Sequence, residues 1–403
     1  MNSQSKPVSR VNPGRIAALR TLVEVERGAH AEERLPIHAP ASGPDRGLSW
    51  HLTLGTLRWQ GSLDHHLKPL VSRPIAKLDP TVRCALRMGT FEGHRMNAPA
   101  RAVVHQTVEA VKRMGFRRAA GIVNAVLRKS LEGSLSTEPR HLLPGWLEAR
   151  WRNHTGWLER IRTPAPLSIA GSNLEPLGLS PAVLEGEPIA DLWVLPPGSG
   201  SVEQLDGFED GRFWVMDAAA ARVADMVAEA TPIGGRVLDA CAAPGGKTFR
   251  LLANGLQVMA VDASRERLER FVQNSHRLRL DSKCMQHDWL LGPASSLGTF
   301  DTVLVDAPCT GLGTVRRHPE IIWRRAPGDP ASMGIVQRQV TQNAATHVKP
   351  GGRLIYAVCS TEPEEGINVA SSIEGWAIEH HWASAPPTGD EDGFQVFQLK
   401  AKV

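Results

Sequence analysis

The sequence predicts an all-helical first half and an α/β second half built on a mostly parallel sheet. Apolar residues recur at helical spacing from position 16 to position 131, for example at Ile16, Leu19 and Val23. From Asp217 onward, helical segments alternate with short apolar runs, which is the pattern of parallel strands joined by crossover helices. A chain of 403 residues is long enough for two or three domains.

Glycines and prolines divide the first half into several helices. Gly28, Pro69 and Pro74 predict helix ends, because these residue types interrupt a helical pattern. Pro80 predicts the start of another helix, and the stretch 115–121 predicts a break before the last one. We therefore expect a compact bundle of five to seven helices in a domain of residues 1–135.

The segment 136–213 is rich in Pro and Gly and predicts a connector with some structure of its own. It holds Trp146, Trp151 and Trp157. Such aromatic side chains could stack on nucleic-acid bases, but packing against a neighbouring domain is the commoner role of a tryptophan. We expect the packing role.

The last part, residues 214–403, is predicted to form one α/β domain. The expected helices are 218–230, 265–278 and 332–348. The expected strands are a run that ends at Asp239, 256–261, 283–286, 300–305 and 353–358. Two short runs near the end, 377–382 and 394–399, could close the sheet in antiparallel orientation.

Charge is divided unevenly between these parts. Residues 1–135 hold 21 Lys and Arg against 10 Asp and Glu, a balance of +11, whereas the whole chain has a formal net charge of +4. The remainder is therefore negative by 7. Such asymmetry favours a polyanion, such as a phosphate backbone, bound by the first part. The alternative is that these charges only solvate helix faces.

Composition excludes several classes of protein. A hydrophobic content of 42% and a charged content of 22% are typical of a globular domain with a core. No apolar run is long enough for a membrane span, and Met1 to Arg10 lack the apolar core of a signal peptide, so we expect a cytoplasmic protein without a membrane partner. The 5 cysteines include no Cys-x-x-Cys pair, so we expect reduced thiols and no metal site.

The run 237–248, VLDACAAPGGKT, has the strand, glycine turn and helix start of a nucleotide-type cofactor loop. Gly245 and Gly246 permit a tight turn and the close approach of a ligand. Asp262 ends the next strand 23 residues after Asp239, where a carboxylate can accept hydrogen bonds from both ribose hydroxyls.

The cofactor that this loop predicts is S-adenosyl-L-methionine. Neither a Walker phosphate loop nor Gly-x-Gly-x-x-Gly is present, which favours a nucleoside without phosphate. Asp288, after the third expected strand, could meet the adenine edge, although an aspartate at a strand end is often only a helix cap.

Two cysteines lie in sequences suited to thiolate chemistry. Cys309 stands in 306–311, DAPCTG, and Cys359 stands in 356–360, YAVCS. Each follows an apolar, β-rich run, so each thiol is expected at the carboxyl end of a strand, where open α/β sheets place their sites. For Cys84, Cys241 and Cys284 we expect packing roles.

A pair of thiols with a nucleoside cofactor indicates methyl transfer to a pyrimidine base. Cytosine C5 is a poor nucleophile, so a thiolate must first add to C6, which splits one hard step into two. A second acid or base could then help remove the C5 proton and expel the thiol. Asp306 can hold the base edge near N3 and the amino group, and the base must be flipped or unpaired.

These three motifs, in this order, resemble the RNA 5-methylcytosine methyltransferases of the Sun/Fmu (RsmB) type. The run 124–128, NAVLR, is similar to the NusB-like domain of the bacterial small-subunit rRNA enzymes. The resemblance covers nearly the whole chain. It implies an all-α NusB-like RNA-binding domain, a connector with a small RNA-recognition-like subdomain, and a Rossmann-like class I S-adenosylmethionine-dependent methyltransferase domain.

The resemblance also implies roles for individual residues, which the chemistry of the sequence alone leaves open. Cys359 would be the nucleophile, and Cys309 would help to release the product. Asp306 would face both the base and the cofactor, and Arg316, Arg317 and His318 match a region that faces RNA. The cofactor would be surrounded by Cys241, Ala242, Ala243, Pro244, Gly245, Gly246, Lys247, Asp262, Asp288 and Asp306.

The chain departs from the usual family pattern at four places, none of which removes a thiol or a cofactor carboxylate. These are Met216-Asp217 for Gln-Asp, Val358 for Thr before the second cysteine, Glu364-Glu365-Gly366 for Glu-Asn-Glu, and Pro319-Glu320 for Pro-Asp. The function expected is cytosine-5 methylation of small-subunit (16S) rRNA by a monomer.

Three other functions remain open at this point. The same chemistry could act on tRNA, and the altered residues after Cys359 leave room for a non-catalytic RNA-binding or assembly factor that retains the fold. A DNA methyltransferase is the least expected, because no separate target-recognition region follows the catalytic domain.

Overall fold

The computed structural model describes residues 11–138, 141–172, 174 and 179–402. The chain divides into two compact units, one of Met1–Arg162 with His318–Arg324 and one of Thr163–Arg317 with Arg325–Val403. The expectation for the first ten residues lies outside the described residues. Within the described ranges, no helix is both long and apolar enough to cross a membrane.

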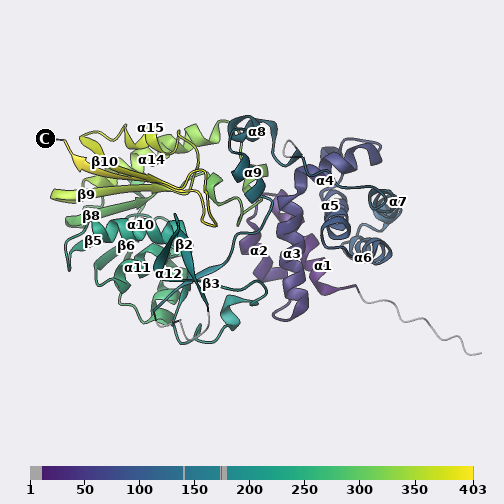
Figure 1. Cartoon of the computed structure of the whole chain (residues 1–403), viewed down its shortest axis with the longest axis horizontal. Helices are drawn as coiled ribbons and strands as arrows, with labels where there is room; N and C mark the ends of the chain where they lie inside the picture. Colours follow the sequence, from purple (N-terminus) through teal and green to yellow (C-terminus); the bar gives the residue numbers. More distant parts are fainter. Residues whose placement is uncertain (1–10, 139–140, 173, 175–178, 403) are drawn as a thin grey trace, which may run out of the picture. The chain divides into compact units, whose positions relative to one another are not determined.

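The first unit is a bundle of helices, as predicted from the apolar spacing (Figure 1). The breaks fall where glycine and proline predicted them, because α1 ends just before Gly28, α4 ends before Pro69, and α5 begins at Pro80. Its helices before the connector are α1 (Pro13–Glu26), α2 (Ala31–His38), α3 (Pro44–Arg58), α4 (Gln60–Leu67), α5 (Pro80–Arg95), α6 (Ala100–Arg113) and α7 (Ala120–Ser130).

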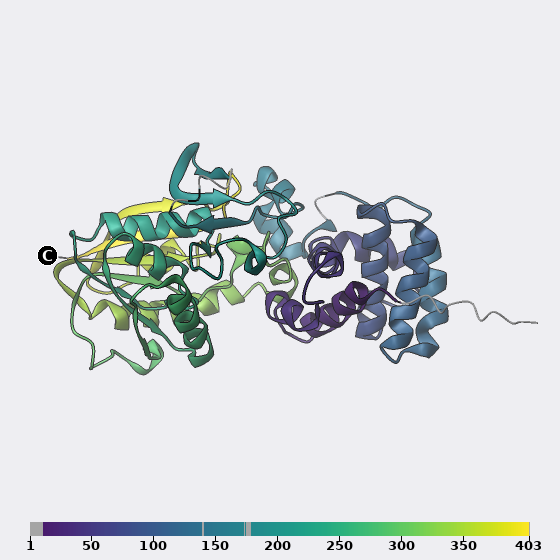
Figure 2. The same cartoon turned by 90° about the horizontal axis from the view of Figure 1, so that it is seen from below.

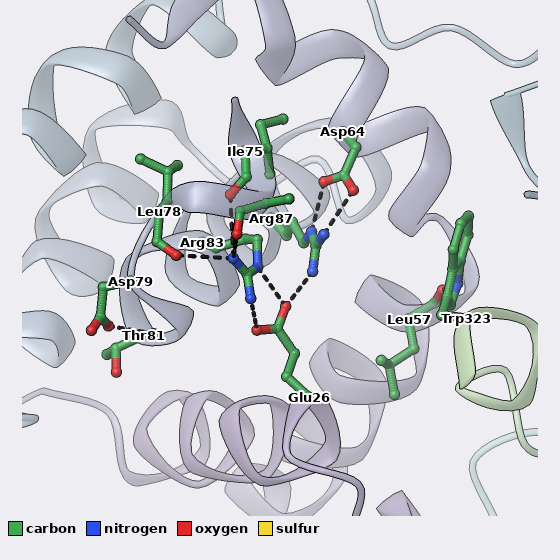
Figure 3. Close-up of polar contacts among 11 residues, drawn as sticks. Glu26, Leu57, Asp64, Ile75, Leu78, Asp79, Thr81, Arg83, Arg87 and Trp323 are labelled. Carbon is green, nitrogen blue, oxygen red and sulfur yellow. Dashed lines mark hydrogen bonds and ion pairs between the residues drawn. The ribbon is translucent and has the colours of Figure 1, made fainter. Parts of the chain in front are cut away.

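A partly buried ionic cluster joins three of these helices (Figure 3). Arg87 of α5 lies between Asp64 of α4, with Nε to Oδ1 at 2.6 Å, and Glu26 at the end of α1. Arg83, one turn before Arg87, also pairs with Glu26. Because each guanidinium contacts a carboxylate in a fixed fork, the cluster sets the register of α1, α4 and α5.

A short segment from late in the sequence belongs to this helical unit. Residues His318–Arg324 include α13 (Ile321–Arg324) and group with the bundle rather than with the α/β unit. Trp323 Nε1 donates to the carbonyl of Leu57 at 2.9 Å (Figure 3), and the buried Glu320 accepts from Ala31 N at 3.1 Å. No pattern in the sequence predicted this return of the chain.

The connector 136–213 is divided between the two units. Helices α8 (Gly145–Trp151) and α9 (Thr155–Arg160) belong to the first unit, where Trp151 and Trp157 are buried with ring centroids 6.0 Å apart. These two rings therefore pack against each other, and Trp146 is half-buried. Packing of the three tryptophans against a neighbouring domain stays a prediction. A small sheet of order β2-β3-β1-β4 belongs to the second unit. Its strands are β1 (Ser168–Ala170), β2 (Ser180–Leu184), β3 (Glu187–Val194) and β4 (Trp214–Val215).

The second unit is built on a seven-stranded sheet of order β10-β11-β9-β8-β5-β6-β7. The neighbours from β9 to β7 pair in parallel, while β11 and β10 pair antiparallel, as the two runs near the chain end predicted. The strands are β5 (Arg236–Asp239), β6 (Gln257–Asp262), β7 (Lys283–Gln286), β8 (Phe300–Asp306), β9 (Val348–Val358), β10 (Trp376–Ala383) and β11 (Gln395–Ala401).

Helices cover both faces of this sheet (Figure 1). One face carries α10 (Ala218–Glu229), α11 (Gly246–Ala253) and α12 (Arg265–Leu278), and Figure 2 views the unit from this side. The other face carries α14 (Asp329–Ala345) and α15 (Ile367–Ala370). The central strands are apolar on both faces because both are covered, which confirms the predicted Rossmann-like architecture.

The strand order reverses between β5 and β8, and ligands of open α/β sheets bind at the carboxyl ends beside such a switch point. There the chain presents Asp239 at the end of β5, Asp262 at the end of β6 and Asp306 at the end of β8. The register pairs Asp306 with Ala357, two residues before Cys359. The predicted site residues are thus brought to one edge of the sheet.

Candidate active site

The loop between β5 and α11 depends on Gly245. This residue caps α11 with a φ of +118°, a left-handed conformation that favours glycine. A Cβ at this position would overlap the ring of Phe249 and lie 2.8 Å from a ring carbon of Phe271. At Gly246, by contrast, a Cβ would meet only Val215 O, at 4.0 Å. A side chain or ligand atom therefore has no room beside Gly245, whereas the space beside Gly246 is open.

Asp262 fastens this loop to the end of β6. The side chain is 3% exposed, with Oδ2 accepting from Ala243 N at 3.1 Å and Oδ1 accepting from Ser264 N at 2.9 Å. Asp288 begins the short helix Trp289–Leu291 and accepts from Leu290 N at 2.9 Å. The capping alternative for Asp288 is thus observed, and its contact with a cofactor stays a prediction.

Asp239 is a buried carboxylate beneath the same loop. Its Oδ2 accepts from Thr248 Oγ1 at 2.6 Å, while Oδ1 has no hydrogen-bond partner among the described residues. Burial raises the pKa of Asp239 from 3.8 to about 7, because water no longer stabilises the charged form. At pH 6 the folded protein therefore keeps a proton that the unfolded chain has lost.

This raised pKa predicts a pH-dependent stability. Between about pH 4 and pH 7 the folded state binds more protons at Asp239 than the unfolded state, so the free energy of unfolding falls as pH rises through this window. Asp239→Asn removes the titration. We expect the free energy of unfolding of the wild type, relative to the variant, to fall by roughly 3 kcal/mol from pH 5 to pH 8. Urea denaturation measures both free energies of unfolding. If they differ by the same amount at every pH, the prediction is wrong.

Lys247 of α11 reaches the end of β8. Its Nζ lies 2.6 Å from Asp306 Oδ2 and 5.0 Å from the centre of the Phe394 ring. Burial lowers the pKa of Lys247, but the ion pair and hydrogen bond with Asp306 raise it by more. The ammonium group is therefore charged at neutral pH and lies beside the Asp306 carboxylate and close to Cys359.

The two predicted cysteines lie in contact. Cys309 follows β8 and Cys359 follows β9, and their Sγ atoms are 3.0 Å apart. The hydrogen bond with Cys359, together with burial, raises the pKa of Cys309 well above its ordinary value. Cys309 thus stays a protonated thiol at neutral pH, which suits it to donate a hydrogen bond rather than to attack.

The remaining three cysteines are not part of this contact pair and differ in their burial. Cys84 is buried in α5, as expected for a packing role, and Cys241 is half-buried in the loop, where burial raises its pKa. Cys284 differs from the expectation, because it is exposed on the edge strand β7. In the part of the chain that the structure describes, no group of three His, Cys, Asp or Glu could hold a metal ion.

A region that faces RNA should expose its cations to solvent, but Arg316 and Arg317 are largely covered. Arg316 is 3% exposed and pairs with Asp390 at 3.3 Å, and Arg317 pairs with Asp217 at 2.6 Å and with Asp392 at 2.9 Å. Both guanidinium groups therefore hold segments of the α/β unit together. The next residue, 318, already belongs to the helical unit.

Sequence reasoning missed the polar residues behind the cysteine loops, chiefly Glu365 and Gln337. Both are fully buried and bonded to each other at 3.0 Å. Glu365 stands in an acidic run that suggests an exposed turn, and Gln337 lies 28 residues earlier in α14. No local signal in one sequence joins them.

Two family models match the chain in the order of its two units. The model described as 16S rRNA methyltransferase RsmB/F matches residues 230–383, and the NusB family model matches residues 12–132. The second match confirms that the helical domain is NusB-like. The first includes the cofactor-type loop and both cysteines of the contact pair.

Curated relatives match the chain over nearly its full length. A protein of Thermus thermophilus named ribosomal RNA small subunit methyltransferase B is 36% identical over 370 residues, which are 90% of this chain and 88% of the relative. A protein of the same name from Serratia proteamaculans is 31% identical over 403 residues, covering 93% and 92%.

Solved structures share the fold at lower identity. The crystal structure of PH0851 matches 98% of this chain and 100% of its own with a TM-score of 0.80 at 22% identity. NSun6 from Pyrococcus horikoshii, solved with SFG, matches 64% of this chain and 98% of its own with a TM-score of 0.55 at 19% identity. Because relatives above 30% identity match along most of their length, the chain belongs to the ribosomal RNA small subunit methyltransferase B family and is a methyltransferase.

Proposed function

We propose that this protein methylates C5 of a cytosine in small-subunit (16S) rRNA, with S-adenosyl-L-methionine as methyl donor and a covalent bond between Cys359 and C6. The observation that carries the proposal is the 3.0 Å contact of Cys309 and Cys359 beside the Lys247–Asp306 ion pair. The proposal includes a monomer that acts in the cytoplasm and has no DNA substrate. The names of the relatives support rRNA over tRNA.

The residues around the β5–α11 loop fit S-adenosyl-L-methionine. The open space at Gly246 admits a ligand, and the buried Asp239 Oδ1 is a polar atom beneath the loop without a partner among the described residues. When bound, this cofactor supplies a methyl group on a positively charged sulfur. The residues that would hold it are 241–247 with Asp262, Asp288 and Asp306.

Cys359 is suited to be the nucleophile by its neighbours. Lys247 carries a positive charge that interacts with Cys359, and Cys309 can donate a hydrogen bond to the Cys359 sulfur. A cysteine attacks as the thiolate, so a cation and a hydrogen-bond donor are suitable neighbours for an attacking sulfur. Its addition to C6 moves the electrons of the C5–C6 double bond to C5, which can then accept a methyl group. Asp306 would orient the base through N3 and the amino group.

Cys309 is suited to the release step. After methylation the C5 proton leaves to a base, its electron pair re-forms the C5–C6 double bond, and Cys359 departs from C6 as a thiolate. The protonated Cys309 thiol, 3.0 Å away, can stabilise that leaving sulfur by hydrogen bonding. The shifted pKa of Cys309 and its burial support this division of roles.

The helical unit would hold the RNA backbone. Its second half exposes a basic patch, defined as Arg113, Arg117, Arg118, Arg128 and Lys129. Arg113 ends α6, Arg117 and Arg118 lie in the short turn before α7, and Arg128 and Lys129 lie in the last turn of α7. The cations at the two helix ends also complement the helix dipoles. Exposed cations bind phosphate groups and release counterions, which makes binding dependent on salt.

Neutralising this basic patch should weaken RNA binding and flatten its salt dependence. With all five residues changed to Gln, we expect the slope of log K against log salt to fall by about 0.7 to 0.9 for each phosphate that is no longer neutralised. Filter binding of an rRNA fragment across a series of salt concentrations measures this. The exposed Arg338 and Lys402 of the α/β unit, changed to Gln, serve as the control. An unchanged slope in the five-residue variant would show that the basic patch does not contact RNA phosphates.

The proposed activity can be tested with purified protein. Incubation with labelled S-adenosyl-L-methionine and either small-subunit rRNA or total tRNA, followed by digestion to nucleosides, identifies the product by mass spectrometry. We expect 5-methylcytidine from rRNA. If 5-methylcytidine forms from tRNA alone, the proposed rRNA substrate is wrong. If the label appears in another nucleoside, the proposed methylation of cytosine C5 is wrong.

A further inference from the structure

One buried carboxylate, that of Glu365, contacts both cysteine loops. Thr310 directly follows Cys309, and Ser360 directly follows Cys359. Glu365 Oε1 accepts from Thr310 N at 2.7 Å, while Oε2 accepts from Ser360 Oγ at 2.5 Å and also from Thr310 Oγ1. The same side chain is therefore bonded to the neighbour of each thiol.

Two other buried residues hold Glu365 in place. Gln337 Nε2 donates to Glu365 Oε1 at 3.0 Å and to the carbonyl of Pro308 at 2.9 Å, directly before Cys309. Tyr356 OH donates to the carbonyl of Glu365 at 2.5 Å and lies 3.1 Å from Gln337 Oε1. The network thus reaches the Cys309 loop on both sides of the cysteine and the end of β9.

The four side-chain contacts of Glu365 are all with donors. An ionised carboxylate has about four lone-pair positions and no proton of its own, so four donors match it. Burial raises the pKa of Glu365, and the hydrogen bonds from Ser360, Thr310 and Gln337 oppose that shift. A buried carboxylate is costly unless such bonds are kept, and they are kept only while both loops stay together.

We propose that Glu365 is a positioning residue for methyl transfer, which joins the Cys309 loop to the Cys359 loop and sets the contact between their sulfur atoms. This inference rests on the proposed two-thiol chemistry. Glu365 acts through Thr310 and Ser360. Its presence also explains why two loops from different strands present their thiols 3.0 Å apart.

Two substitutions of Glu365 separate positioning from charge. Glu365→Ala removes all four hydrogen bonds, so we expect the single-turnover rate of methyl transfer to fall about 100-fold, with the Kd for RNA nearly unchanged. Glu365→Gln can keep all four, with its carbonyl facing Thr310 N and Gln337 Nε2 and its amide donating to the two hydroxyls. We expect its rate within about tenfold of the wild type.

The control for general destabilisation is Glu92→Gln. Glu92 is also buried, 1% exposed, and pairs with Arg15 inside the helical unit. We expect a lower melting temperature and an unchanged single-turnover rate. A glutamine variant of Glu365 as slow as the alanine variant would show that the charge, and not the set of hydrogen bonds, is needed, and would overturn the proposal.

A second measurement needs neither RNA nor the cofactor. The pKa of Cys309 is raised chiefly by its hydrogen bond with Cys359, so parting the loops should lower it. We measure the rate of Cys309 alkylation by iodoacetamide at pH 8, where the protein is folded, by peptide mass spectrometry. A lower pKa gives more thiolate at this pH, so Glu365→Ala should be alkylated about tenfold faster than the wild type, and Glu365→Gln by a smaller factor. The wild-type alkylation rate in Glu365→Ala would overturn the proposal.

The two assays distinguish failure of this inference from failure of the proposed function. If the wild type methylates no RNA, the proposed function is wrong, but the alkylation rates of Cys309 still decide whether Glu365 holds the thiols together. If the wild type methylates cytosine and Glu365→Ala is as fast, the proposed function stands and the positioning role is excluded.

Discussion

Replacing Cys359 by alanine abolishes methyl transfer and leaves no RNA bound covalently to the protein. We expect the rate to fall by at least ~10³-fold, because no other thiolate is placed to add to C6. Cys309→Ala has a different outcome. The bond to C6 forms, but the leaving sulfur loses its hydrogen-bond partner, so a protein–RNA adduct accumulates. Denaturing gels with labelled RNA show the adduct directly.

The contrast between the two cysteine variants decides their roles. An adduct in Cys359→Ala and none in Cys309→Ala would reverse the assignment. Cys284→Ala is the control, since its thiol is exposed on the edge strand β7 and away from the pair, and we expect wild-type behaviour.

Gly245→Ala disrupts the loop at the end of β5 and with it the α/β unit. The added Cβ would overlap the Phe249 ring, and the backbone at this position has a φ of +118°. Left-handed geometry and overpacking together cost about 2 to 5 kcal/mol. We expect a lower melting temperature together with the loss of S-adenosyl-L-methionine binding.

Gly246→Ala gives the matched comparison for that variant. Its Cβ would meet only Val215 O, at 4.0 Å, so the fold should be retained. If the cofactor occupies this open space, the methyl group should weaken its binding without changing the melting temperature. Calorimetric titration and thermal unfolding separate the two effects. Wild-type affinity in Gly246→Ala would contradict a cofactor at this position.

Much of the fold could be predicted from sequence because its signals are local. The alternating apolar runs predicted β7 and α12 with their observed bounds, and Pro80 marked the start of α5. Asp262, Asp288 and Asp306 could also be predicted as site carboxylates, since each stands at or just after the end of an expected strand. Asp239 was predicted only as the end of a strand, because its burial beneath the loop depends on the folded structure.

The rest depends on contacts between distant positions. The return of His318–Arg324 to the helical unit depends on Trp323 meeting Leu57, which are 266 residues apart. The ion pairs that bury Arg316 and Arg317 involve carboxylates 74 to 100 residues away. Glu365 looked like a departure from a family pattern until its contacts with Thr310 and Ser360 were seen. A single sequence carries no signal for such pairings.

Bisulfite sequencing of host RNA, with and without this gene, tests the central claim most directly. Every cytosine of rRNA and tRNA is examined in the deletion strain and after return of the wild type or of Cys359→Ala. The account predicts that one small-subunit rRNA site loses its protection on deletion, regains it with the wild type and stays unprotected with Cys359→Ala. A deletion that changes no cytosine in either class of RNA would contradict it.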